Sequence, residues 1–240
     1  MKKYITIIII LVFGGGLIFL FNLNNKPENI LVLQQNREGQ LERSEYVIDE
    51  SDMYSVDALQ PSAAIGELTS SEEQWLVHMR EEEKLARDVY TTLGDIWGMR
   101  IFSNIAGSEQ THANSVKVLL GRYGLTDPVK DNVVGIFTIP EMQKLYNDLI
   151  SQGKLSLLEA LKIGATVEDL DIYDLDKALS ETKSADIQVA YKNLQKGSRN
   201  HMRSFVKSIE SQGGTYSPVY ISSSAYNAII SSPQEKGRMQ

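Results

Sequence analysis

Five side chains of types that coordinate metals fall near the middle of four amphipathic segments. They are three glutamates and two histidines: Glu83, Glu109, His112, Glu168 and His201. Glu109 and His112 are three residues apart, which places a carboxylate and an imidazole on one face of a helix. Buried unpaired carboxylates are costly, so a cation between these groups would stabilise them. The residues predict a buried metal site that suits iron or manganese, with zinc as a further option.

The composition limits the chemistry and the partners. The 240-residue chain has no cysteine, which excludes disulfides, thiolate metal sites and iron–sulfur clusters. There are only three histidines, so most ligands of any metal must be Asp or Glu. A formal charge of −7 and a pI near 5.1 argue against nucleic-acid binding, which needs a basic face.

Four long segments carry the alternating spacing of three and four residues that turns one helix stripe toward partner helices. They cover residues 70–97, 100–124, 155–183 and 184–212, with Ser70 and Ser184 as expected caps. About thirty residues separate the second segment from the third and contain a short helical run at 140–150, which predicts a long crossover. The predicted fold is all-α, a four-helix bundle whose long crossover contains a short helix.

The first 23 residues have the character of a membrane-targeting sequence. After two lysines the chain is uncharged across residues 4–23, enough as a helix to span a hydrocarbon core of about 30 Å. No small-x-small cleavage site follows, so we expect an uncleaved transmembrane anchor, or a secreted protein if the segment is removed. The lysines place the remaining chain on the extracytoplasmic side.

Residues 24–70 differ in composition from the four amphipathic segments. They hold nine acidic and three basic residues and no sustained apolar period. This composition predicts a disordered acidic linker between the anchor, residues 1–23, and the folded domain, residues 71–240. An interaction tail is the alternative. After Gly214 the chain is apolar enough to dock on the bundle, but its role is not evident from the sequence.

The candidate ligands lie in motifs that resemble those of rubrerythrin-type ferritin-like proteins. Residues 83–90, Glu-Lys-Leu-Ala-Arg-Asp-Val-Tyr, are similar to the first-helix ligand motif, a Glu followed by Ala-Arg and then Tyr. Glu109-Gln110-Thr111-His112 is similar to the Glu-x-x-His of the second helix, and Glu168 matches the glutamate of the third. The resemblance implies a ferritin-like fold with a di-iron type of carboxylate site.

A more specific resemblance covers residues 72–226. They resemble an uncharacterised ferritin-like family catalogued as domain of unknown function 2202, through the run Gly-Ser-Arg-Asn-His at 197–201 and the Tyr-Ser-Pro at 216–218. That family has no settled function, so this resemblance implies the fold more directly than the activity.

The fourth helix departs from the di-iron pattern. A full site would have Glu-x-x-His there, whereas this chain has Ser198-Arg199-Asn200-His201 and lacks one bridging carboxylate. Asp171, three residues after Glu168 on nearly the same helix face, is the replacement ligand that we favour. Glu82 is a second option on an offset stripe. Two metals, one metal or none remain open.

The resemblance implies reaction with a small oxidant, dioxygen or peroxide. In the primary hypothesis an extracytoplasmic iron protein reduces peroxide or oxidises ferrous iron, with Glu109 bridging, Glu83 and Glu168 terminal, and each histidine on one metal. No catalytic residue beyond the metal ligands is expected. The alternative is a redox-inactive binding or scaffold module with a vestigial site, which Ser198 favours.

Other residues have less specific interpretations. A hydrolase dyad of Ser198 and His201 lacks an orienting acid and an oxyanion hole, and we set it aside. His78 is expected to be a surface or partner histidine. Three tyrosines on the inward stripes are expected to be packing residues: Tyr90, Tyr123 and Tyr191. The oligomeric state is open, with a dimer as one option.

Overall fold

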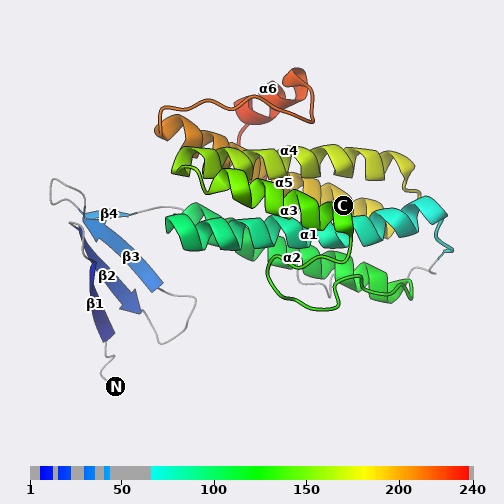
Figure 1. Ribbon diagram of the computed structural model, residues 1–240, viewed down its shortest axis with the longest axis horizontal. Helices are drawn as coiled ribbons and strands as arrows, with labels where there is room; N and C mark the ends of the chain where they lie inside the picture. Colours follow the sequence, from blue (N-terminus) through cyan, green and yellow to red (C-terminus); the bar gives the residue numbers. More distant parts are fainter. Residues whose placement is uncertain (1–5, 13–15, 23–29, 36–40, 44–65, 238–240) are drawn as a thin grey trace. The chain divides into compact units, whose positions relative to one another are not determined.

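The computed structural model describes residues 6–12, 16–22, 30–35, 41–43 and 66–237. The chain divides into two units, Met1–Ile48 and Asp49–Gln240. In the second unit the described residues form six helices and the loops that connect them, with no strand (Figure 1). The all-α prediction is therefore confirmed for the described part of that unit.

The first unit contains an antiparallel sheet. Its strands pair in chain order: β1 (Thr6–Val12), β2 (Gly16–Asn22), β3 (Ile30–Gln35) and β4 (Leu41–Arg43). In the register, Ile9 lies opposite Phe19 and Leu20 lies opposite Val32.

The transmembrane helix predicted over residues 4–23 is wrong at the described residues of that run, which form β1 and β2. Residues 6–12 are mostly Thr, Ile and Val, whose branched Cβ atoms favour extended backbone, and apolarity alone does not distinguish a helix from a strand. Within the described ranges, no helix has both the length and the apolarity to cross a bilayer. Strands β3 and β4 also differ from the predicted disordered linker, whose residues 24–29, 36–40 and 44–65 lie outside the described residues.

Four long helices pack side by side in the second unit: α1 (Ser70–Trp97), α2 (Arg100–Arg122), α4 (Leu157–Glu181) and α5 (Ala185–Ser211). Helices α1 and α5 each contact both α2 and α4, so the four form a closed bundle (Figure 1). These bounds agree with the predicted segments within two residues at every end.

The N-cap of α1 lies one residue earlier than the sequence indicated. Thr69, not Ser70, is the N-cap: its hydroxyl accepts from the Glu72 N–H, while the Glu72 carboxylate accepts from the Thr69 N–H. Glu72 also accepts from the N–H groups of Lys183 and Ser184, which ties this end of α1 to the α4–α5 connection. The helix ends at Gly98, whose φ of 67° suits a residue without a Cβ.

A crossover is required because α2 and α4 run in the same direction. Tyr90 of α1 contacts Phe102 of α2 and Glu168 of α4. Earlier on α1, Glu83 contacts His112, which is later on α2, and His78 contacts Asp174, which is later on α4, so α1 is antiparallel to both neighbours. The connection contains α3 (Pro140–Gly153), which packs on α1 and α4. The predicted short helix at 140–150 is confirmed and is three residues longer.

Buried charges of α1 hold this crossover in place. Glu81 accepts from the backbone N–H groups of Thr138 and Ile139, at 2.7 Å each. Asp88 accepts from the Gly135 N–H at 2.9 Å and from the Lys84 ammonium at 2.5 Å. Each of these carboxylates thus has a fixed donor that compensates its burial.

The bundle core consists of two apolar clusters with a polar layer between them. One cluster includes Leu85, Tyr90 and Phe205, and the other includes Leu76, Val116 and Leu194. Glu83, Glu109, Glu168 and Ser198 lie between these clusters along the helices and are at most 2% exposed. Apolar packing on both sides therefore keeps water away from the polar layer.

The segment after Gly214 docks on α4 and α5, as its apolar composition indicated. It contains α6 (Ser223–Ser231), which contacts α5. Asp169 of α4 accepts from the Tyr216 hydroxyl at 2.9 Å and from the backbone N–H groups of residues 219–221 at 2.5 to 3.1 Å. Glu235 pairs with Arg199 and Arg203 of α5.

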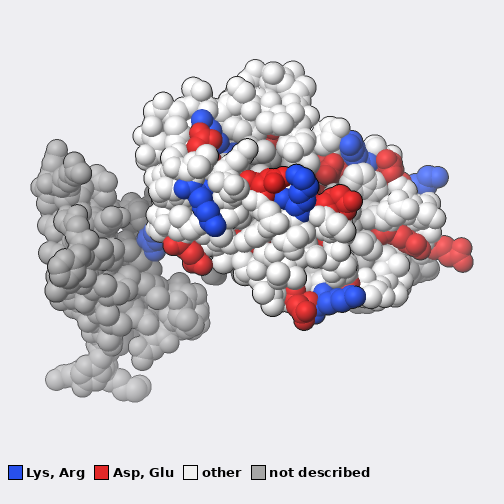
Figure 2. Space-filling view, viewed as in Figure 1, with Lys and Arg blue, Asp and Glu red and all other residues white. Residues whose placement is uncertain are grey.

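One face of this domain carries charges of both signs (Figure 2). On the face drawn in Figure 2, Lys and Arg side chains lie among Asp and Glu side chains, and no broad patch of one sign is seen there. Such a face offers no dense row of cations to a phosphate backbone.

Candidate metal centre

The polar layer contains two groups of potential ligands that share one residue. Glu83, Glu109 and His112 form the first group, and Glu109, Glu168 and His201 form the second. Within each group the ligand atoms lie within 4.8 Å of one another. Every one of the five side chains that the sequence singled out as ligands on the inward stripes therefore belongs to this centre.

Glu109 of α2 lies between the two imidazoles. Its Oε2 is 2.7 Å from Nδ1 of His112, and its Oε1 is 2.7 Å from Nδ1 of His201. Glu83 Oε2 is 3.3 Å from the first Nδ1, and Glu168 Oε2 is 3.6 Å from the second. The rings of the two histidines stack with centroids 5.7 Å apart.

The separations of Glu83 and Glu168 from the imidazole nitrogens, 3.3 and 3.6 Å, fit coordination, whereas the two separations of Glu109, 2.7 Å each, are shorter than the usual spacing of two ligands on one ion. Metal–ligand distances of about 2.0–2.2 Å place neighbouring ligand atoms roughly 3.0–3.6 Å apart in octahedral or tetrahedral geometry. Among the described residues, Nδ1 of both histidines, Oε1 of Glu83 and Oε1 of Glu109 are buried without a hydrogen-bond partner. The nitrogens therefore approach the carboxylates closely but not in the direction of an N–H···O bond, an arrangement that a cation between them would explain.

Burial and mutual charge perturb the ionisation of this centre. Burial raises the pKa of Glu83 to about 8, although His112 acts against it. Burial also raises the pKa of Glu168 to about 7, and the Glu109 carboxylate adds to this effect. Burial would raise the pKa of Glu109 as well, but the two imidazoles hold it well below its usual range.

Both imidazoles are stabilised in the protonated form. Burial lowers the pKa of His201, but Glu109 and Glu168 more than offset this effect and raise it to about 10. The pKa of His112 is likewise above its usual value, because Glu109 and Glu83 outweigh desolvation. In the absence of a cation, protons compensate the buried carboxylates, and a metal would have to displace them.

The glutamates of the centre differ from other buried carboxylates of this fold in the donors that surround them. Glu72, Glu81 and Asp169 each accept two or more backbone N–H groups. Among the described residues, no backbone N–H donates to Glu83, Glu109 or Glu168. The polar layer therefore lacks the donors that this chain uses elsewhere to stabilise a buried acid.

Asp171 does not join either group of three. It is buried, and the Ser198 hydroxyl donates to its Oδ2, while its Oδ1 has no hydrogen-bond partner among the described residues. The Ser198 hydroxyl oxygen also lies 2.9 Å from the Leu194 carbonyl oxygen, one turn earlier on α5. Asp171 therefore lies against the fourth-helix position where the expected glutamate is missing, and its role as a replacement ligand stays a prediction.

Two residues position candidate ligands at the centre, and the sequence did not indicate this role for either of them. The Tyr90 hydroxyl donates to Oε1 of Glu168 and lies 3.2 Å from the Gly164 carbonyl, so this tyrosine fixes a candidate ligand as well as packing. A Cβ on Gly197 would lie 2.5 Å from Cε1 and 2.7 Å from Nε2 of His112. Gly197 therefore leaves room for the imidazole, a close approach that one sequence does not reveal.

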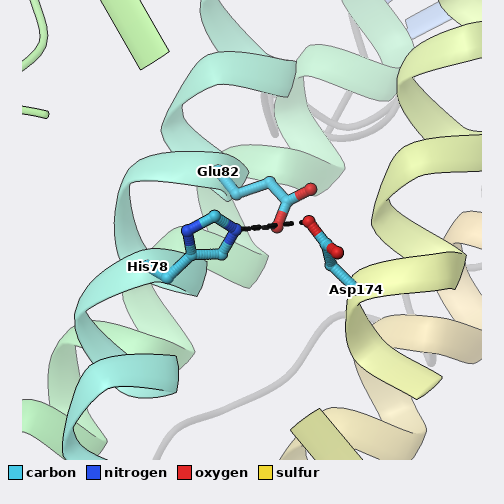
Figure 3. A group of neighbouring side chains, drawn as sticks. All are labelled: His78, Glu82 and Asp174. Carbon is cyan, nitrogen blue, oxygen red and sulfur yellow. Dashed lines mark hydrogen bonds and ion pairs between the residues drawn. The ribbon is translucent and has the colours of Figure 1, made fainter. Parts of the chain in front are cut away.

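A third group lies outside the polar layer. His78, expected to be a surface or partner histidine, faces Asp174 of α4 and Glu82, one turn further along α1 (Figure 3). Its Nε2 is 3.3 Å from an oxygen of each carboxylate. The spacing from 78 to 82 on one helix was a usable signal, but it could not reveal Asp174, which comes from another helix.

Comparisons with known proteins agree on the relationship of the helical unit. The model of the family described as "Uncharacterized protein domain (DUF2202)" matches residues 72–233. The "Uncharacterized protein MJ0754" of Methanocaldococcus jannaschii is 51% identical over 170 residues, which are 71% of this chain and 92% of that protein. A crystal structure of hypothetical protein MJ0754 from Methanococcus jannaschii is similar with a TM-score of 0.71 and 50% identity, over 72% of this chain and 99% of that one.

The match covers α2 to α6 and all but the first two residues of α1, and it includes all the residues of the centre. The chain therefore belongs to the uncharacterised DUF2202 family.

Proposed function

We propose that the helical unit is a ferritin-like protein that holds two metal ions, most suitably iron, and reacts with dioxygen or peroxide. The observation that carries this proposal is the position of Glu109, which is common to two groups of one imidazole and two carboxylates. One carboxylate shared by two sites is the arrangement of ligands in dinuclear carboxylate proteins built on four helices. Parallel α2 and α4 joined by a crossover support the ferritin-like assignment.

The ligand chemistry favours iron or manganese, with zinc as a weaker candidate. Carboxylates outnumber imidazoles, and the chain has no thiolate to offer a softer metal. Bound iron would supply one-electron chemistry, which peroxide reduction and ferrous oxidation both need. Glu109 would hold both ions, Glu83 and His112 would hold one, and Glu168 and His201 the other.

The protein residues around the centre would position these ligands. The Tyr90 hydroxyl orients Glu168, and Gly197 leaves the space that His112 occupies. The apolar clusters on either side exclude water, which strengthens electrostatic interactions within the layer. The pair of Ser198 and Asp171 leaves one side of the layer with fewer ligands than a symmetric site, and a small oxidant would reach that side.

The location of the domain is a proposal that the sequence alone supports. The uncharged run at residues 4–23 follows two lysines, which is typical of export signals. We propose that the helical unit works on the extracytoplasmic side, attached to or released from the membrane. Protection of the unit from added protease in intact cells would contradict this location.

The dinuclear proposal is tested by metal content. The purified full chain should contain about two iron or manganese ions per molecule, or take them up after chelation. Glu109→Gln keeps the size of the side chain but removes the shared charge, so it should lower the occupancy of both sites. Glu83→Gln should lower the occupancy of only one. Glu210→Ala, at an exposed residue of α5, is the control and should leave both unchanged.

Two observations favour a second function, that of a binding or scaffold module without a metal. The Ser198 hydroxyl already satisfies one oxygen of Asp171, and the histidines can compensate the glutamates as protonated ions. A metal-free bundle of this kind would be a redox-inactive binding or scaffold module. If the chain takes up neither iron nor manganese at neutral pH, the scaffold function is correct and the dinuclear proposal fails.

A further inference from the structure

The third group of ligand atoms is built from two helices and is partly open to solvent. His78 and Glu82 are one turn apart on α1, and Asp174 reaches them from α4 (Figure 3). The His78 side chain is 35% exposed, that of Asp174 is 14% exposed, and that of Glu82 only 2%. The group thus has a buried carboxylate at its base and two side chains nearer the surface.

Glu82 has no donor that explains its burial. Both of its carboxylate oxygens are buried and have no hydrogen-bond partner among the described residues. By contrast Glu81, the preceding residue, accepts two backbone N–H groups. A buried carboxylate without donors is costly unless a cation lies close to it. The only cationic group in ion-pair contact with Glu82 among the described residues is His78, at 3.3 Å.

The spacing of the three atoms fits a metal ion. Nε2 of His78 is 3.3 Å from Oε2 of Glu82 and 3.3 Å from Oδ2 of Asp174, and all three ligand atoms lie within 4.8 Å of one another. Ligands at about 2.1 Å from a first-row divalent ion lie roughly 3.0–3.5 Å from one another. In Figure 3 both carboxylates point toward the same ring nitrogen, so all three ligand atoms face one position.

An ion can reach this position from solvent. His78 and Asp174 line a surface groove of about 750 Å³, together with residues of the first turns of α1 and the end of α4. Glu181 and Glu73 also line the groove and give it further negative charge. Water molecules in the groove would complete the coordination of an ion held by only three protein ligands.

We propose that His78, Glu82 and Asp174 bind one divalent first-row metal ion, such as zinc, manganese or ferrous iron, at a site separate from the buried centre. One imidazole and two carboxylates are suitable ligands for each of these ions. The site does not depend on the dinuclear centre, because it shares no residue with either of the other groups. An ion here would compensate Glu82 and tie α1 to α4.

The test measures Co²⁺ binding by equilibrium dialysis in full chains that lack the buried centre through Glu109→Ala and His112→Ala. These chains should retain one Co²⁺, and adding His78→Ala or Asp174→Asn should weaken its binding by about 100-fold. Glu181→Gln is the matched control, since Glu181 lines the same groove but lies outside the group. Absence of Co²⁺ from the background chain, or equal binding after His78→Ala, would overturn the site.

A second measurement uses the unsubstituted chain and needs no variant to fold. His78 is exposed enough to react with diethyl pyrocarbonate, and Zn²⁺ should slow its modification, located by peptide mass. A histidine that serves only as an ion-pair partner would react at the same rate with and without Zn²⁺, and that result would contradict the proposal. Neither measurement depends on whether the buried centre binds metal.

Discussion

Replacing Gly197 by alanine tests whether His112 must keep one position. The new Cβ would lie 2.5 Å from Cε1 of the imidazole, whereas carbon atoms in contact are ordinarily about 3.5–4.0 Å apart. The imidazole ring must therefore move by about 1 Å or more, because residue 197 lies within α5 and the helix backbone holds the new Cβ in place. A displacement of this size in a ligand is expected to weaken metal binding by about 10–100-fold.

The same substitution should have little effect on the metal-free fold. Alanine is favoured over glycine in a helix by about 1 kcal/mol, and forcing the ring off its rotamer costs about 0.5–1.5 kcal/mol. These contributions nearly cancel, so the free energy of unfolding should change by less than about 1 kcal/mol. Gly107→Ala is the matched control: Gly107 is an exposed residue inside α2, and an added Cβ there meets nothing within 4 Å.

Comparison of the two variants separates the effect of the His112 ring position on metal affinity from the effect of alanine on stability. Gly107→Ala should raise the free energy of unfolding by about 1 kcal/mol and leave metal affinity unchanged. Metal affinity is measured by isothermal titration of the chelated protein, and stability by urea denaturation. If Gly197→Ala binds metal as tightly as the parent, either the imidazole is not a ligand or the ring has room that the structure does not show, and the reasoning fails.

Three further predictions concern contacts at or near the centre. Tyr90→Phe keeps the packing but removes the hydrogen bond to Glu168, so urea denaturation should show a loss of about 1 kcal/mol. Asp169→Asn removes the charge that holds the segment after Gly214 against α4, so the free energy of unfolding should fall by about 3 kcal/mol. Limited proteolysis should then cut first near residues 216–221, and unchanged protection there would contradict this prediction. The pKa values of Glu83, about 8, and His201, about 10, are raised, so the metal-free fold binds more protons than the unfolded chain. The stability of the metal-free fold should therefore fall as pH rises from about 5 to 9, while its metal affinity should rise. Denaturation and metal titration at several pH values check both trends.

The sequence predicted the long helices because their signals are local. Apolar spacing located all four within two residues, and Ser184, which was expected as a cap, is the N-cap residue of α5. The cap of α1 was missed by one residue because Thr69 and Ser70 are both suitable caps, and only the contact with Glu72 distinguishes them. The convergence of the five central ligands was also predictable, since each one lies in the middle of an inward stripe.

Contacts between distant segments could not be predicted in this way. The Gly197 approach to His112 and the partnership of Asp174 with His78 both depend on how α1, α2, α4 and α5 are placed in space. The strands of residues 6–12 and 16–22 were missed for a different reason: a long apolar run satisfies the length criterion for a membrane helix, and β-branched residues were not weighed against it.

The sharing of Glu109 has a consequence for the order of folding. Glu83, Glu109 and His112 all belong to the hairpin of α1 and α2, whose connection is two residues long, so one set of ligands can assemble from local contacts. Glu168 and His201 belong to the other hairpin and reach Glu109 only after the two hairpins dock. An ion captured by the first hairpin would thus be present before the second pocket exists, and filling of the second pocket would report the docking step in a stopped-flow experiment.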